Sequence, residues 1–281
     1  MWPRLGPLPV PTPYGLMVAL GLIAALTLTG KLARRRGMDP KAVQDVLAWS
    51  CLAGLLGAKL LLVFEQPSDF FREPLALLLQ GGVFYGGVLA AAVVTPVLAH
   101  RKGLPLHALA DVCAPALALG HAFGRIGCFL AGCCWGRACD LPWAVVYHSE
   151  HAVAHHSLGG LAVHPVQVYE AGGELLLMLG ALWLFSRQRF AGQTWWTYVV
   201  AYGALRTWLE TYRGDPRGRW FGDLLSTSQV VGIGAMVIGL IFLVYCARKR
   251  HPPTPLDDDT SSGADGPDGA AELDEAGVPV S

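Results

Sequence analysis

The sequence is poor in charged side chains. Asp, Glu, Lys and Arg together make up 15% of its 281 residues, whereas hydrophobic residues make up 53%. A soluble domain carries about 25% charged residues, so this balance excludes an ordinary soluble domain. It predicts a protein embedded in a lipid bilayer, and nothing in the composition points to nucleic acid as a partner.

A cleavable signal peptide is also missing from the sequence. The first apolar run follows a proline-rich start whose single basic residue is Arg4, and the run is long enough to span a membrane. Signal peptides have shorter apolar cores behind a basic start. We therefore expect this run to be retained as the first membrane helix.

The seven cysteines lack the paired Cys-x-x-Cys spacing of structural zinc sites. Three lie in apolar runs and are expected to be inert packing residues: Cys51, Cys113 and Cys246. The other four cluster in the middle of the chain: Cys128, Cys133, Cys134 and Cys139. A disulfide within this cluster and four free thiols remain alternatives, and we predict neither a metal site nor a cofactor.

Apolar runs of spanning length recur along most of the chain. A membrane helix needs roughly 17–25 predominantly apolar residues. Seven segments fit that length: 14–33, 45–64, 79–99, 106–131, 166–185, 194–212 and 228–247. The predicted fold class is an all-α integral membrane protein with about seven transmembrane helices.

Basic residues set the expected orientation, because short loops rich in Lys and Arg stay in the cytoplasm. Such loops follow the first, third, fifth and seventh runs. The N-terminus is therefore predicted outside and the C-terminus in the cytoplasm. Arg213, Arg217 and Arg219 follow the sixth run on the opposite side, so ligand contact explains them better than topology does.

Two regions of different composition make up the chain. Residues 1–250 hold all the apolar runs and most of the basic side chains, whereas 251–281 are rich in Pro, Gly, Ser and acidic residues. A segment with so few large apolar side chains cannot bury enough surface to fold. We predict a transmembrane domain over 1–250 and a disordered acidic cytoplasmic tail over 251–281.

The fourth run ends in a segment that reads as a binding site, from Gly124 to Arg137. Arg125 stands near the end of a long apolar run, where a charge is costly in lipid. Glycines surround it, including Gly132 and Gly136, and allow backbone to approach a bound group. The combination indicates a functional site.

Further ionisable residues lie in the sixth run. Arg206, Glu210 and Arg213 are spaced i, i+4 and i+7, which places all three on one stripe of a helix. An internal Arg206–Glu210 salt bridge is one interpretation. The other is that a surplus arginine faces an anionic ligand, and we favour it because intramembrane charges usually mark substrate paths.

Polar or flexible residues also interrupt three other runs. Gln167, Glu170 and Glu174 lie along the fifth run and are expected to face the same polar interior as Arg206. The third run begins with the glycine pairs 81–82 and 86–87 around Phe84 and Tyr85, a pattern that permits close helix contact. Tyr14 begins the first run.

Taken in order, these motifs resemble the prolipoprotein diacylglyceryl transferases. The matching segments are Tyr-Gly-Leu at 14–16, Gly-Gly-x-x-x-Gly-Gly at 81–87, Gly-Arg-Ile-Gly-x-Phe-x-x-Gly-x-x-x-Gly at 124–136, His-Pro-x-Gln-x-Tyr-Glu at 164–170 and Tyr-Gly-x-x-Arg-x-x-x-Glu-x-x-Arg at 202–213. The resemblance spans about residues 12–247. Five motifs in the same order make a chance match improbable.

The resemblance implies an enzyme of the bacterial inner membrane, with its active site toward the outer face. It would move the diacylglyceryl group of phosphatidylglycerol onto the lipobox cysteine thiol of a prolipoprotein signal peptide. Carried over by position, the catalytic residues would be Arg125, Arg206, Tyr85 and Glu210. The substrate-binding residues would be Arg125, Arg206, Arg213, Gly136, Gly132, Tyr14, Gln167 and Glu170.

Three positions depart from the family pattern. Tyr85 stands where the family often has a histidine proposed to accept the thiol proton, Cys128 where it has an asparagine, and Cys133 where it has an acidic residue. Either another residue accepts the proton, with His121, His164 and Glu170 as candidates, or the surrounding positive charge is the main cause of thiol activation. The changed positions also raise a second hypothesis, a redox or metal-binding membrane protein on the same scaffold, or a transferase with another acceptor.

Overall fold

A computed structural model describes residues 13–74, 83–147, 160–214, 218–220, 224–249 and 252–253. It is built almost entirely of helices, whose bounds are α1 Pro13–Arg35, α2 Pro40–Glu65, α3 Pro67–Arg72, α5 Phe84–Arg101, α6 Leu106–Ala131, α8 Val166–Phe185, α9 Gln193–Leu209 and α10 Thr227–Lys249. A 3-10 turn, Glu210–Tyr212, extends α9, and the short strands β1 (Arg219–Trp220) and β2 (Leu225–Ser226) pair antiparallel before α10.

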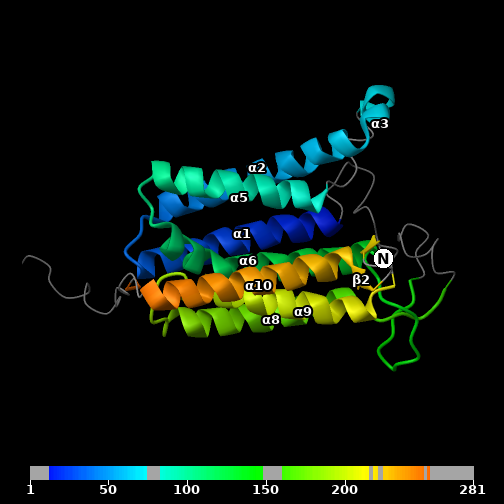
Figure 1. The fold of residues 1–281 in the computed structure, drawn as a ribbon. Coiled ribbons are helices and arrows are strands. Elements are labelled where there is room, and N and C mark those ends of the chain that lie inside the picture. The colour runs from blue at the N-terminus through cyan, green and yellow to red at the C-terminus, as the bar shows by residue number, and fades with distance from the viewer. Residues whose placement is uncertain are drawn as a thin grey trace, which may run out of the picture.

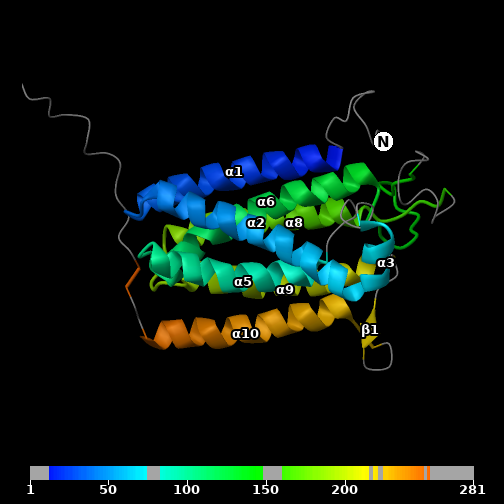
Figure 2. The ribbon, with the colours of Figure 1, turned by 90° about the horizontal axis from the view of Figure 1, so that it is seen from above.

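The long helices lie side by side with similar axis directions in both views (Figures 1 and 2). α6 is the central element and packs against α1, α8 and α9, while α10 covers α9. α2 and α5 form a pair that contacts the rest mainly through α1, with a smaller contact between α5 and α6. This arrangement brings polar residues from α6, α8 and α9 to one place.

Five helices among the described residues are long and apolar enough to cross a membrane: α1, α2, α6, α8 and α10. This confirms the predicted class, an all-helical protein with several membrane segments. The predicted run 79–99 starts outside the described residues, and α5 begins only at Phe84. Gly81, Gly82, Arg217 and, apart from 252–253, the predicted tail 251–281 also lie outside them.

The predicted run 194–212 differs most from the structure. The α-helix ends at Leu209, the chain tightens into a 3-10 turn, and Arg213 is extended with φ −72° and ψ 144°. Arg213 therefore does not continue the helical stripe of Arg206 and Glu210. Its backbone instead forms an isolated bridge with Gly136, which draws it to the loop after α6.

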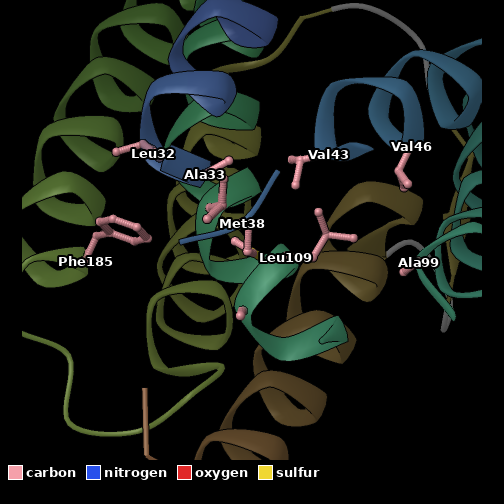
Figure 3. Packing of buried hydrophobic residues seen from close by; sticks show 10 residues of the cluster. Leu32, Ala33, Met38, Val43, Val46, Ala99, Leu109 and Phe185 are labelled. Atoms are coloured by element: carbon pink, nitrogen blue, oxygen red, sulfur yellow. The ribbon is translucent and has the colours of Figure 1, made fainter. Parts of the chain in front are cut away.

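A tightly packed apolar cluster holds one end of the bundle together (Figure 3). It joins the end of α1, the start of α2, the ends of α5 and α8 and the start of α6 through Leu32, Ala33, Met38, Val43, Val46, Ala99, Ala108, Leu109, Val112 and Phe185. The last turns of α1, α5 and α10 carry basic residues at this same end. Burial of these apolar side chains stabilises this end of the bundle.

A buried carboxylate fixes the connection between α8 and α9. Asp111 of α6, 1% exposed, accepts hydrogen bonds from Gln188 Nε2 at 3.1 Å, Gly192 N at 2.6 Å and Trp195 N at 2.9 Å. These donors satisfy the charge that burial would otherwise destabilise. Asp111 thereby positions the two helices that carry the polar residues described next.

Candidate active site

A single buried carboxylate lies between two arginines from different helices. Glu170 of α8 is fully buried, and its Oε1 atom is 3.0 Å from Arg125 Nη2 of α6 and 4.0 Å from Arg206 Nε of α9. The Arg125 contact is a close ion pair, whereas the 4.0 Å separation from Arg206 is an electrostatic contact without a hydrogen bond. Glu170 thus aligns two guanidinium groups that are 81 positions apart in sequence.

Arg206 has two further partners. Its Nη1 atom is 2.7 Å from Glu210 Oε2, one helical turn away, and its Nη2 atom donates to Ser228 Oγ of α10 at 2.9 Å. The side chain is only 9% exposed. The Arg206–Glu210 salt bridge, the interpretation that we did not favour from the sequence, is therefore present, and it fixes the rotamer of Arg206.

His121 lies on the other side of Arg125. Its Nε2 accepts a hydrogen bond from Arg125 Nε at 3.1 Å, and its Nδ1 is 2.6 Å from Glu174 Oε1. Because the arginine Nε can only donate, the imidazole proton belongs on Nδ1, facing the carboxylate. Tyr198 OH also donates to Glu174 Oε2 at 3.4 Å.

The charges of this cluster differ from the sequence expectation. Two arginines, Arg125 and Arg206, face three carboxylates, so the formal charge is −1 when His121 is neutral. The expectation of a surplus arginine at Arg206 is wrong, because Glu210 and Glu170 both lie near it. Any positive charge that offsets the net charge of −1 has to come from Arg213 or from a proton on His121.

The loop after α6 is positioned by the left-handed turn at its start and by hydrogen bonds from α8. Gly132 ends α6 with a left-handed φ of 65°, which glycine adopts without strain. Gln167 of α8, fully buried, donates to Cys133 O at 2.7 Å and to Tyr147 OH at 3.0 Å. Gln167 thus positions this loop, whereas Glu170 and Glu210 contact the arginines directly.

Gly136 lets the loop approach α8. A Cβ atom there would lie 2.6 Å from the His164 carbonyl oxygen, far inside contact distance. Gly136 N donates to that oxygen at 3.1 Å, and Arg137 N donates to Tyr212 O at 2.9 Å. The two predicted glycines, Gly132 and Gly136, are therefore required by the backbone itself.

Arg213 reaches the cysteines of this loop. The Cys128 and Cys133 thiols and, after them, Arg213 lower the pKa of the Cys134 thiol. The neighbouring Cys128 and Cys134 groups raise the pKa of the Cys133 thiol, with burial as a further cause. Negative charge in this group of thiols is therefore concentrated at Cys134, beside a guanidinium.

The two predicted tyrosines lie at helix starts. Tyr14 begins α1 and packs over α6, since a Cβ on Gly127 would meet its Cδ2 atom at 3.1 Å. Tyr85 lies in the first turn of α5, 37% exposed, on a helix that packs mainly against α2. A role for Tyr85 in the chemistry stays a prediction.

Residues that the sequence did not single out complete the site. Ser228 binds Arg206, Tyr147 binds Gln167, and Tyr198 binds Glu174. Their partners are distant in sequence, so no local pattern marks them. The contact of His121 with Arg125 had a signal, because the two residues are one helical turn apart.

Comparison with known proteins identifies the relatives of this chain. A family model described as prolipoprotein diacylglyceryl transferase matches residues 3–245. A Clostridium tetani protein named phosphatidylglycerol–prolipoprotein diacylglyceryl transferase is 33% identical over 240 residues, which cover 84% of this chain and 94% of the relative. A Bordetella avium protein of the same name is 34% identical over 263 residues, covering 89% and 96%.

These matches cover nearly the whole described fold and all the residues of the arginine cluster. They favour a transferase over a redox or metal-binding protein on the same scaffold. The chain belongs to the prolipoprotein diacylglyceryl transferase family.

Proposed function

We propose that this protein transfers the diacylglyceryl group of phosphatidylglycerol to the lipobox cysteine thiol of a prolipoprotein, the first step of lipoprotein maturation. The relatives' names give diacylglyceryl transfer, with phosphatidylglycerol and a prolipoprotein as the substrates. The observation that carries the proposal is the pair Arg125 and Arg206, held in register by the buried Glu170. Two arginines held close together by one carboxylate suit the phosphodiester of a headgroup.

The arginines act on the charge of the leaving group. The substrate sulfur attacks the glyceryl carbon, a carbon–sulfur bond forms, and the carbon–oxygen bond to phosphate breaks. The electron pair leaves with the oxygen of glycerol phosphate, so negative charge grows there. Arg125 and Arg206, with Arg213 as a further contact, stabilise that charge, and Glu170 and Glu210 keep the first two arginines oriented. Gly132, Gly136, Gln167 and Tyr14 shape the surrounding loop and wall.

His121 is the proton acceptor that the contacts support best. Glu170 is already shared by two arginines, and His164 is buried, with its Nδ1 atom 3.3 Å from Tyr169 OH. The His121 side chain is 25% exposed and has Glu174 behind it at 2.6 Å. When Arg125 turns to the phosphate, Nε2 is released to take the thiol proton. The proton on His121 offsets the negative charge that grows on the leaving phosphate, in a cluster whose formal charge is otherwise −1.

The proposed setting is the bacterial inner membrane, crossed by all seven long helices of domain 1–250. The basic last turns of α1, α5 and α10 at one end of the bundle support a cytoplasmic location for that end and for the acidic segment 251–281. The N-terminus and the arginine cluster would then lie toward the outer face, where a signal peptide presents its lipobox.

Purified protein with labelled phosphatidylglycerol and a lipobox peptide tests the activity. We expect label on the peptide with a free cysteine thiol and none on a peptide whose thiol is blocked. Arg206→Ala should abolish transfer, whereas Arg187→Ala, at an exposed position stacked on Trp183, should retain it. The proposal is wrong if wild-type protein transfers no label while an authentic family enzyme does so under the same conditions.

A further inference from the structure

Three cysteine sulfur atoms converge next to the arginine cluster. The Sγ atoms of Cys128, Cys133 and Cys134 all lie within 4.8 Å of one another. Three sulfurs around one ion with metal–sulfur bonds of about 2.3 Å are about 4.0 Å apart. The sulfurs therefore need to close by less than about 1 Å to share an ion, a change within the reach of side-chain rotation.

The turn that follows α6 creates this convergence. Cys128 is in the last turn of the helix, Gly132 reverses the chain with φ 65°, and Cys134 has φ 64°. A left-handed conformation is rare for a residue with a Cβ and costs about 1–2 kcal/mol. The linear spacing of the cysteines gave no sign of a metal site, because the reversal and not the spacing brings the sulfurs together.

Neighbouring contacts keep the three thiols in place. Gln167 donates to the Cys133 carbonyl at 2.7 Å, and Gly136 N donates to His164 O at 3.1 Å. The loop is thus tied to α8 on both sides of Cys134. Ligands held in advance on a tied backbone bind metal without a large ordering cost.

The surrounding charges suit an electron-rich thiolate group. Three thiolates around one ion leave a net charge of −2 for a monovalent and −1 for a divalent cation. Arg125 lies three positions before Cys128 on the same face of α6, and Arg213 interacts with Cys134. Because the carboxylates of its own cluster already balance Arg125, Arg213 is the guanidinium that compensates the excess negative charge.

We propose that Cys128, Cys133 and Cys134 bind one soft, thiophilic d10 cation, such as Cu(I) or Zn(II), at the edge of the active site. Thiolate ligands select such ions over hard cations such as Mg²⁺ and Ca²⁺. Three metal–sulfur bonds form as the thiol protons pass to the solvent. The ion is an added ligand of the transferase and does not replace its activity.

Metal binding measured directly, without lipid or peptide, tests this site. Full-length protein reduced in detergent is titrated with Cd²⁺ and Zn²⁺ under nitrogen. We expect one Cd²⁺ per chain, an ultraviolet cadmium–thiolate charge-transfer band, and metal protection of three of the seven thiols from alkylation by mass spectrometry. Mg²⁺ should give neither signal.

Single substitutions assign the ligands. Cys128→Ser, Cys133→Ser and Cys134→Ser should each weaken Cd²⁺ binding at least about tenfold. Cys139→Ser, in a cysteine outside the group, should bind like wild type. A missing charge-transfer band in wild-type protein, or equal weakening by Cys139→Ser, overturns the proposal. The thiol-protection measurement on wild-type protein holds even if a variant fails to fold.

A second readout rests on the proposed function. The three thiolates that hold Zn²⁺ attract Arg125 and Arg213. Zn²⁺ should therefore slow diacylglyceryl transfer, and a chelator should restore the rate of transfer. Unchanged transfer by a protein with Zn²⁺ bound overturns this inhibitory role. Metal binding in a protein without transferase activity would refute the proposed function and leave the metal site standing, so the two failures are distinguishable.

Discussion

Glu170→Gln removes the charge that holds the arginine pair together while keeping the size of the side chain. Glu170 Oε1 lies 3.0 Å from Arg125 Nη2 and 4.0 Å from Arg206 Nε, so these two nitrogens are no more than 7.0 Å apart. Two unit charges at that distance repel each other by about 2 kcal/mol at an effective dielectric constant of about 20. Without the carboxylate this repulsion separates the guanidinium groups.

The loss of alignment should appear in the rate of the chemical step. A penalty of about 2 kcal/mol in the transition state lowers kcat about 30-fold. The KM for phosphatidylglycerol should stay equal or fall, because the variant removes a negative charge near an anionic substrate. A loss of uniform binding would raise KM instead.

The assay measures kcat and KM separately with labelled phosphatidylglycerol in mixed micelles and a lipobox peptide in excess. Thermal unfolding in the same detergent controls for lost structure. Transfer within about twofold of wild type, in a folded variant, would refute the idea that Glu170 aligns the arginines. A raised KM with unchanged kcat would refute it as well.

Three further predictions concern the groups around this pair. Glu174→Gln should lower kcat about tenfold or more, because the carboxylate that lies 2.6 Å from His121 Nδ1 and orients the imidazole is lost; an unchanged kcat would argue against the proton-acceptor role. Gly136→Ala should lower the melting temperature and activity, since its Cβ would meet a carbonyl oxygen at 2.6 Å, whereas Gly180→Ala, which meets nothing within 4 Å, should be tolerated. Cys134 should be alkylated by iodoacetamide faster than Cys139 at neutral pH, because neighbouring thiols and an arginine lower the pKa of the Cys134 thiol. The Cys134 thiolate therefore persists as the pH falls below about 8.5. Equal alkylation rates of the two cysteines, measured by mass spectrometry, would contradict that assignment.

Most helices could be predicted because a membrane-spanning segment is a long, uninterrupted run of apolar residues in the sequence. The runs at 14–33, 45–64, 106–131, 166–185 and 228–247 match α1, α2, α6, α8 and α10 to within a few residues. Without water in the bilayer core, a long apolar segment has to satisfy its backbone internally, and the α-helix does so. Local composition therefore decides these elements.

The end of the sixth run could not be predicted in the same way. Residues up to Tyr212 remain compatible with a helix by composition, yet the helix ends at Leu209 and Arg213 turns toward Gly136. That turn depends on a backbone contact with a loop some 77 positions earlier. A helical stripe drawn from i, i+4 and i+7 spacing cannot detect such a contact.

The sequence by itself determined the membrane class, the helices and the ionisable residues whose burial in lipid is costly and therefore indicates a function. These follow from the transfer free energies of side chains and from helical periodicity, which are local properties. Tertiary structure decided which charges from different helices meet. It placed Glu170 between Arg125 and Arg206, paired His121 with Glu174, and reversed the chain at Gly132 so that three cysteines converge. The charged partners come from different helices, and only the packing of α6, α8 and α9 brings them within the few ångströms over which their charges interact.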